Sequence, residues 1–326
     1  MKKWIVISTV AFSVLVLGAA SYGVYIYETV KSTANQIYEA RDPVVVPVSS
    51  QKDNRAAPAP TAGNGRTSPT ATPAVNMDHK EPFTVLVLGV DQRAHDRGRS
   101  DAMILLAVNP EKQKILMFNI PRDTRTEIMG HGTTDKINHA YAFGGVNMSV
   151  QTVEHFLDYP INYYVKVNME GFAKIIDSLG GVNVNNPFGF QYEGHNFAKG
   201  ELTLNGSEAL AFSRMRYDDP RGDMGRNARQ REILKQVIQS ALKVSNILNI
   251  QSVLNEVGDS VRTDITFDDM KSFIKDYRSD IKSIDQVEIQ GKGEMINGIW
   301  YYMVSADEQK RVHQMLEDHV QKKAVP

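Results

Sequence analysis

An uncharged, largely apolar run at residues 4–27 constrains this chain more than any other feature of its sequence. Lys2 and Lys3 precede the run, and Glu28 is the first charged residue after it. At a rise of about 1.5 Å per residue, a helix of this length crosses a bilayer core of roughly 30 Å. The run therefore predicts a transmembrane helix rather than part of a globular core.

A cleaved signal peptide is the alternative, since the small residues at 19–21 would suit a peptidase. The apolar run continues beyond them, however, and Tyr25 and Tyr27 suit a membrane interface. Lys2 and Lys3 before the span place the N-terminus in the cytoplasm. We therefore expect a single-pass, type II protein of the cell membrane, with residues 1–3 inside and everything after residue 27 outside the cytoplasm.

A tether is expected between the span and a folded domain. Residues 28–41 could continue as a short helix, whereas residues 42–80 are rich in Pro, Ala, Ser and Thr. Such a composition cannot bury enough apolar surface to fold, so we interpret residues 28–80 as a stalk and a disordered linker. Residues 81–326 are long enough to form one domain with a large core.

The bulk composition excludes several kinds of site. The formal net charge is −1, which gives no basic field for binding nucleic acid, and we expect no nucleic-acid partner. The chain has no cysteine, so disulfides, thiolate metal sites and a cysteine nucleophile are all excluded.

Short β-rich runs alternate irregularly with helical repeats after residue 80. This order predicts an α/β domain in which helices flank a mixed central sheet. We expect strands at residues 83–90, 102–109, 114–120, 163–167, 182–184, 286–289 and 299–303. We expect helices at residues 146–157, 171–179, 207–212, 226–244, 267–277 and 307–320.

Two acidic residues stand at predicted strand ends. Asp91 closes the first strand and Asp101 opens the second. If the two strands are neighbours, both carboxylates lie at one edge of the sheet, where they would suit Mg²⁺ or Mn²⁺. Ordinary surface turns are the competing interpretation.

Arginines gather in the segments that follow. Arg122 follows a strand, and Arg214 and Arg216 alternate, so in an extended segment both would point the same way. On a helical wheel, Arg226 and Gln230 fall on the apolar stripe of the long helix. Several arginines would suit a diphosphate, whereas the alternative for Arg226 is an internal salt bridge to Asp218, Asp219 or Asp223. The stripe continues through Ile233, Val237, Ala241 and Val244, which would suit a greasy tail.

The combination and order of several motifs resemble the LytR–CpsA–Psr family over the tail, the span and nearly all of residues 81–322. The matching motifs are Leu88-Gly89-Val90-Asp91, Gly98-Arg99-Ser100-Asp101, Asn119-Ile120-Pro121-Arg122-Asp123-Thr124, the run from Asp135 to Gly145, Ser213-Arg214-Met215-Arg216, and the run from Asp223 to Gln230.

The resemblance implies an extracytoplasmic transferase. It would move an anionic glycopolymer, such as wall teichoic acid, from a polyprenyl diphosphate carrier to the C6 hydroxyl of N-acetylmuramic acid in peptidoglycan. Asp91 and Asp101 would hold Mg²⁺, and the polyprenyl tail would lie in an apolar tunnel between sheet and helices. The diphosphate would be held by Arg99, Arg122, Arg214, Arg216, Arg226 and Gln230.

The remaining candidates come from positions beside these motifs. Asp123 or Asp223 could act as the general base, or could instead orient an arginine, and Lys136 could contact phosphate. We also take Arg125, Arg229, Ile233 and Val237 as candidate substrate-binding residues. Two other functions remain open: a pyrophosphatase acting on the same lipid diphosphates, and a membrane-anchored regulator or polymer-binding protein without catalysis.

Overall fold

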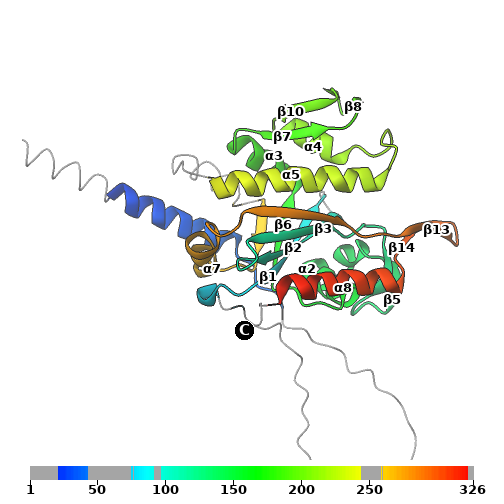
Figure 1. Cartoon of the computed structure of the whole chain (residues 1–326), viewed down its shortest axis with the longest axis horizontal. Coiled ribbons are helices and arrows are strands. Elements are labelled where there is room, and N and C mark those ends of the chain that lie inside the picture. Colours follow the sequence, from blue (N-terminus) through cyan, green and yellow to red (C-terminus); the bar gives the residue numbers. More distant parts are fainter. Residues whose placement is uncertain are drawn as a thin grey trace, which may run out of the picture. The chain divides into compact units, whose positions relative to one another are not determined.

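The computed structural model describes residues 21–42, 75, 77–91, 97–243, 258 and 260–321. The chain forms two compact units (Figure 1). Unit 1 comprises residues 1–39 and 165–279, and unit 2 comprises residues 40–164 and 280–326. Of the predicted span at residues 4–27, only residues 21–27 belong to the described part of the chain. Within the described part of the chain, no helix is both long and apolar enough to cross a membrane.

A six-stranded sheet has the order β11-β6-β1-β2-β3-β12. Pairs β1–β2, β2–β3 and β6–β11 are antiparallel, whereas β3–β12 is parallel, so the sheet is mixed, as predicted. Its strands are β1 (Phe83–Val90), β2 (Ser100–Asn109), β3 (Lys114–Asn119), β6 (Tyr163–Asn168), β11 (Val261–Thr263) and β12 (Ser283–Glu288).

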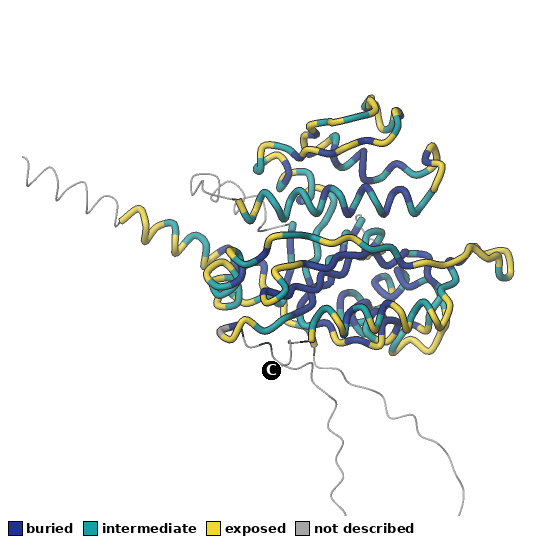
Figure 2. Tube along the Cα trace, viewed as in Figure 1, coloured by how far each residue is buried: buried dark blue, intermediate teal, exposed yellow. Residues whose placement is uncertain are grey.

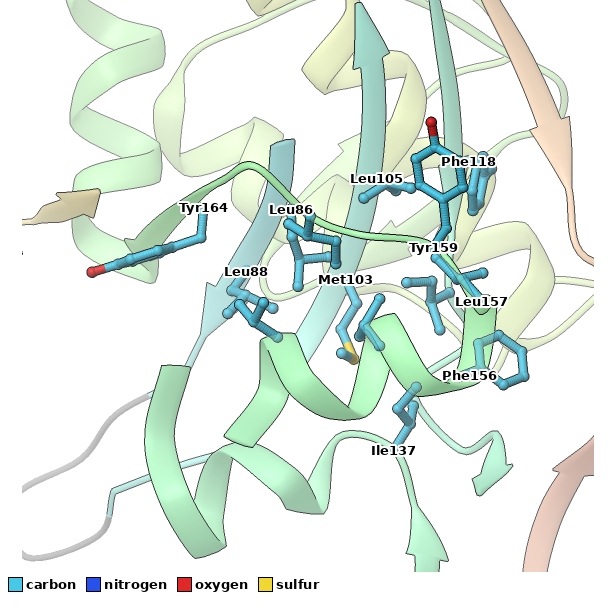
Figure 3. Packing of buried hydrophobic residues seen from close by; sticks show 14 of the residues in the cluster. Leu86, Leu88, Met103, Leu105, Phe118, Ile137, Phe156, Leu157, Tyr159 and Tyr164 are labelled. Carbon is cyan, nitrogen blue, oxygen red and sulfur yellow. The ribbon is translucent and has the colours of Figure 1, made fainter. Parts of the chain in front are cut away.

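In unit 2, helices α2 and α8 cover one face of β1, β2 and β3 (Figure 1). Because strand side chains alternate between faces, Leu86, Leu88 and Leu105 point to this side, and they are fully buried among helix residues such as Phe156 (Figure 3). The other elements of the unit are η1 (Met77–His79), β4 (Arg125–Ile128), β5 (Thr133–Lys136), α2 (His139–Leu157), β13 (Lys292–Ile296), β14 (Ile299–Met303) and α8 (Ala306–Val320).

Unit 1 has its own apolar cluster. Phe190 packs against Phe197 and Phe212, with ring centroids 4.8 and 5.6 Å away, and the fully buried Ile233 belongs to the same cluster. Besides a helix at residues 21–37, the elements are α3 (Met169–Ser178), β7 (Val182–Asn186), β8 (Phe190–Tyr192), β9 (His195–Phe197), β10 (Gly200–Leu204), α4 (Gly206–Arg214), α5 (Asp223–Lys243), α7 (Phe267–Ser272) and the π-helical turn η2 (Phe273–Tyr277).

Most predicted elements are present, with two differences that matter for the site. Helix α2 begins at His139, seven positions before the predicted start at 146, because it continues across a break at Gly144 and Gly145. The short strands β4, β5, β8, β9, β10, β11 and β13 were not predicted. Of the predicted linker at residues 42–80, all but residues 42, 75 and 77–80 lies outside the described residues.

Candidate active site

A β-bulge positions the two predicted metal ligands. Gly89 pairs with Ala102 but Val90 pairs with Ser100, so Asp101 is the extra residue on β2. A bulge of this kind bends the strand and re-aims a side chain. Asp91 follows directly, and its N–H donates to the Arg99 carbonyl at 3.4 Å. Both carboxylates therefore start from the same end of the β1–β2 pair, as the sequence predicted.

Arg122 and Asp123, just after β3, build a network of alternating charge onto this end. Arg122 Nη1 lies 2.7 Å from Asp101 Oδ1, and its Nε lies 3.8 Å from Asp123 Oδ2. Lys136, the last residue of β5, places its Nζ 2.8 Å from Asp123 Oδ1. All four side chains are partly or largely buried. The arrangement brings two cations and two carboxylates together. Arg122 and Lys136 could therefore form charge-assisted hydrogen bonds to an anionic ligand.

Asn138 was not among the predicted site residues, yet it belongs to this network. Its Nδ2 donates to Asp101 Oδ1 at 3.5 Å. Its Oδ1 is buried and has no hydrogen-bond partner among the described residues. Asn138 is the N-cap residue of α2, but its side chain makes no capping hydrogen bond. A buried amide oxygen beside Asp101 that bonds to nothing is costly unless it serves a ligand.

Tyr301 on β14 forms a second layer behind this network. Its hydroxyl donates to Asp135 Oδ1 at 3.3 Å, and Arg125 and Lys136 lie 5.8 and 6.0 Å from its ring centroid. Burial and the nearby Asp135 charge raise the pKa of Tyr301. Burial alone would raise the pKa of Asp135, but hydrogen bonds from His139, from the Lys136 amide and from Tyr301 outweigh it and lower that pKa. This layer holds Lys136 and Arg125 in place.

In unit 1, Arg214 and Arg216 lie at the end of a helix and just beyond it, whereas the sequence analysis considered them in an extended segment. Arg214 is the last residue of α4, and Met215 is its extended C-cap. Met215 is fully buried, whereas the arginines on either side are half-buried. Arg214 lies 3.6 Å from Glu193, and Arg216 lies 4.7 Å from the centroid of the Tyr217 ring.

The first turns of α5 carry a buried ion pair. Arg226 Nη2 lies 2.7 Å from Asp223 Oδ1, and the Arg226 side chain is 7% exposed. Gln230 is half-buried, and Ile233 is fully buried. The predicted buried stripe ends sooner than expected: Val237 is half-buried and Ala241 is exposed, while Val244 lies outside the described residues.

Arg229 stabilises the fold of unit 1. Its guanidinium forms a salt bridge with Asp219 and donates to the carbonyls of Phe212 and Met215. Gly225 makes room for this, since a Cβ there would lie 1.9 Å from the Asp219 carboxylate. Arg229 and Asp219 are 5% and 3% exposed. The prediction that Arg229 binds substrate stays a prediction, and these contacts favour a role in packing.

Three further observations bound the site. Arg99 is exposed and immediately precedes β2. Across the residues that the structure describes, no cluster of three or more His, Cys, Asp or Glu side chains is arranged to hold a metal ion. An open groove of about 870 Å³ in unit 2 lies between the β2–β3 turn and α8, and it contains none of the predicted site residues.

Comparison with known proteins matches the chain to one family. The LytR_cpsA_psr family matches residues 46–318. The protein named polyisoprenyl-teichoic acid–peptidoglycan teichoic acid transferase TagU from Halalkalibacterium halodurans is 42% identical over 323 residues, which is 98% of this chain and 99% of that protein. The protein of the same name from Bacillus subtilis is 42% identical over 94% of this chain and 93% of its own length.

Solved structures agree with the sequence comparison. The crystal structure of B. subtilis TagU covers 76% of this chain and 100% of its own, with a TM-score of 0.62 and 45% identity. A structure of TagT bound to LIIa-WTA covers 77% of this chain and 94% of its own, with a TM-score of 0.65 and 28% identity. The family match covers most of the chain, and the chain therefore belongs to the LytR–CpsA–Psr family.

Proposed function

We propose that this chain transfers an anionic glycopolymer of the wall teichoic acid type from a polyprenyl diphosphate carrier to peptidoglycan. The observation that carries the proposal is the network of Asp101, Arg122, Asp123 and Lys136, in a chain that matches teichoic acid transferases over almost its whole length. The acceptor is the C6 hydroxyl of N-acetylmuramic acid.

The proposed reaction replaces the phosphoanhydride bond of the donor with a phosphodiester bond to the acceptor. The acceptor oxygen forms a bond to the phosphorus that carries the polymer, the bond from that phosphorus to the bridging oxygen breaks, and polyprenyl phosphate leaves. Such a transfer depends on in-line positioning and on neutralising charge on the leaving group. We propose that Arg122 and Lys136 of unit 2 neutralise this charge, with Arg99 and Arg125 as further cations.

The donor set in unit 2 fits a divalent cation. Asp91 and Asp101 would hold Mg²⁺, or Mn²⁺, because carboxylate oxygens are the ligands that these hard ions prefer. The buried Asn138 Oδ1 without a hydrogen-bond partner supports this assignment. When bound, the ion would neutralise diphosphate charge and so weaken the bond to the leaving group.

The two candidate bases are both paired with cations. Asp123 lies between Arg122 and Lys136, and Asp223 lies against Arg226. In both pairs the carboxylate oxygens already hold a cation in position. We therefore propose that both carboxylates orient these side chains, and that the proton of the sugar hydroxyl is transferred to another acceptor.

Unit 1 supplies the second set of predicted ligands. We propose that Arg214, Arg216, Arg226 and Gln230 bind phosphate oxygens of the donor, and that Ile233 and Val237 contact its polyprenyl chain. The buried Arg226 near the start of α5 supports this, since the N-terminus of a helix favours anions. The topology proposed with this is type II: residues 4–27 anchor the chain in the membrane, and the part of the chain after residue 27 lies outside the cytoplasm.

An acceptor-dependence assay tests the proposal. Full-length protein in detergent is incubated with Mg²⁺ and a labelled polyprenyl-diphosphate-linked polymer, with and without un-crosslinked peptidoglycan. A transferase releases polyprenyl phosphate and labels the glycan only when peptidoglycan is present. Release at the same rate without peptidoglycan would instead indicate a pyrophosphatase, and release under neither condition would favour a non-catalytic protein.

A further inference from the structure

The helix at residues 21–37 is fixed to the rest of unit 1 near its end. Its Ala34 and Ile37 are only 3% and 6% exposed. Two residues beyond the helix, the N–H of Glu39 donates to the carbonyl of Thr263 on β11 at 2.8 Å. The helix therefore leads directly into the folded part of unit 1.

A ring contact joins the same helix to α7. The rings of Tyr27 and Phe267, the first residue of α7, lie edge to face with their centroids 5.6 Å apart. Lys271, one turn further along α7, places its Nζ 5.1 Å from the centroid of the Phe267 ring. Tyr27 is therefore held against α7, and Figure 1 shows α7 beside this helix.

The first two turns of this helix expose large apolar and aromatic side chains. The exposed fractions are 46% for Tyr22, 62% for Val24, 53% for Tyr25 and 46% for Tyr27. At about 100° per residue, these four positions fall on all sides of the helix, and Figure 2 shows this end of the helix as exposed. A helix that is apolar on all sides is normally covered, either in a protein core or in a membrane.

The exposed end of the helix belongs to the uncharged run at residues 4–27, which predicts the membrane span. Tyr27 is the last residue of that run, and it is also the residue in contact with Phe267. A free tether between the span and the folded unit would add up to about 3.3–3.6 Å per residue, whereas here two touching rings join them. A bilayer that covers residues 21–27 therefore brings α7 to the level of the lipid head groups, where tyrosines are favoured.

Helix α7 and the turn η2 present a surface that suits this level. Phe267, Lys271 and Ile274 recur at i, i+4 and i+7, so they share one side of the helix. Ile274 is 59% exposed, and the side chain of Lys275 next to it is 83% exposed. At a membrane interface, apolar side chains enter the acyl boundary while lysines extend their amines to lipid phosphates. Because Lys271 pairs with Asp268 at 2.6 Å, apolar contact rather than net charge is the main attraction.

We propose that α7 and η2 seat unit 1 on the outer surface of the membrane, with Ile274 among the lipids and the helix at residues 21–37 continuing into the bilayer. The partner is the interfacial layer of a phospholipid bilayer. This inference rests on the topology given with the proposed function, and it adds a fixed position for unit 1. A polyprenyl-linked donor presents its diphosphate at the same surface, so this seating brings unit 1 to the donor.

The chain has no cysteine, so a single introduced cysteine can carry a label. Full-length Ile274→Cys is labelled with a fluorophore and placed in phosphatidylcholine vesicles that contain lipids with a nitroxide near the head group. The nitroxide should quench this fluorophore, with or without added phosphatidylglycerol. Glu201→Cys is the matched control, because Glu201 is exposed on β10, which Figure 1 shows well separated from α7. No quenching at residue 274, or equal quenching at both positions, would overturn the proposal.

An insertion separates a fixed seating from chance contacts of a tethered unit. Seven helix-forming residues added between Glu28 and Thr29 nearly preserve the helical phase and lengthen the helix by about 10 Å. The fluorophore at residue 274 should then lose most of its quenching by the nitroxide. Undiminished quenching would show that the helix does not set the position of unit 1, which contradicts the seating.

The quenching measurement needs no substrate, so it is independent of the proposed reaction. If the label at residue 274 is quenched as expected but the parent protein transfers no polymer, the proposed function is wrong and the seating remains. If the parent protein transfers polymer but the label at residue 274 is not quenched, the seating is wrong and the transferase remains.

Discussion

The guanidinium of Arg122 lies 2.7 Å from the carboxylate of Asp101 and joins the segment after β3 to the bulge in β2. The pair is partly exposed, with 20% of the Arg122 side chain and 34% of the Asp101 side chain accessible. A partly solvated pair contributes little to stability, since water screens it. Its position beside Asp123 and Asn138 therefore matters more for chemistry than for folding.

Arg122→Gln should lower the transfer rate by about 10²–10³-fold, the usual cost of removing one preorganised donor from a charged transition state. Its free energy of unfolding should stay within about 1 kcal/mol of wild type. The control is Arg311→Gln, which breaks an equally short pair with Glu308 on α8 and should leave transfer unchanged. Transfer by Arg122→Gln within threefold of wild type would contradict the proposed role.

Arg229→Ala should mainly lower the free energy of unfolding. It would leave the buried Asp219 carboxylate without its salt-bridge partner, which destabilises a protein by about 3–5 kcal/mol. Arg216→Ala, at a half-buried position, should change the free energy of unfolding by only about 0.5 kcal/mol. Urea denaturation of both variants checks this. A stable Arg229→Ala variant that has lost donor binding would mean that Arg229 is a ligand.

The lowered pKa of Asp135 predicts how stability depends on pH. A carboxylate with a depressed folded pKa contributes stability above its unfolded pKa of about 3.9, and loses it as pH falls through the folded value. The difference in unfolding free energy between wild type and Asp135→Asn should therefore stay constant from pH 7 to about pH 5 and shrink below about pH 4. A difference that does not change down to pH 3 would show that the charge of Asp135 is not involved.

The break in α2 predicts that replacing Gly145 by alanine lowers the stability of the protein. Gly145 has φ of 66° and ψ of −148°, a conformation that residues with a side chain rarely adopt, although nothing lies within 4 Å of its would-be Cβ. Gly145→Ala should therefore destabilise by about 1–3 kcal/mol through backbone strain alone. Gly23→Ala, also with open space but in a regular helix, should be neutral or slightly stabilising. Equal melting temperatures for the two variants would argue against strain.

Most of the sheet was predictable because strands such as β1, β2 and β3 are dense in buried apolar residues, whereas β11, with only three residues, was not predicted. The start of α2 was missed because Gly144 and Gly145 usually end a helix, whereas here the break at these two residues separates two helical stretches. Strand β13 was missed because the apolar and polar residues of Lys292–Ile296 do not alternate. The signal for it was the Asn297-Gly298 dipeptide, which favours a hairpin.

At the site, sequence motifs identified Asp101, Arg122 and Lys136 but not the residues that support them. Tyr301 joins the network through a hydrogen bond to Asp135, 166 positions earlier in the chain. No local pattern reports a contact at that separation. Asn138 lies inside a quoted motif, but only its buried oxygen, which has no hydrogen-bond partner in the described part of the chain, distinguishes it from an ordinary helix cap.

The most direct test of the account is transfer by Asp101→Asn, with Asp285→Asn as its matched control. The same substitution at Asp285 breaks an exposed pair with Lys114 at 2.8 Å, which lies outside the charged network. The measurement is mass spectrometry of polymer phosphate linked to muramic acid after incubation with polyprenyl-diphosphate-linked polymer, Mg²⁺ and peptidoglycan. The account predicts that Asp101→Asn folds normally and forms no linked product, while Asp285→Asn matches wild type. Wild-type yields from Asp101→Asn would contradict it.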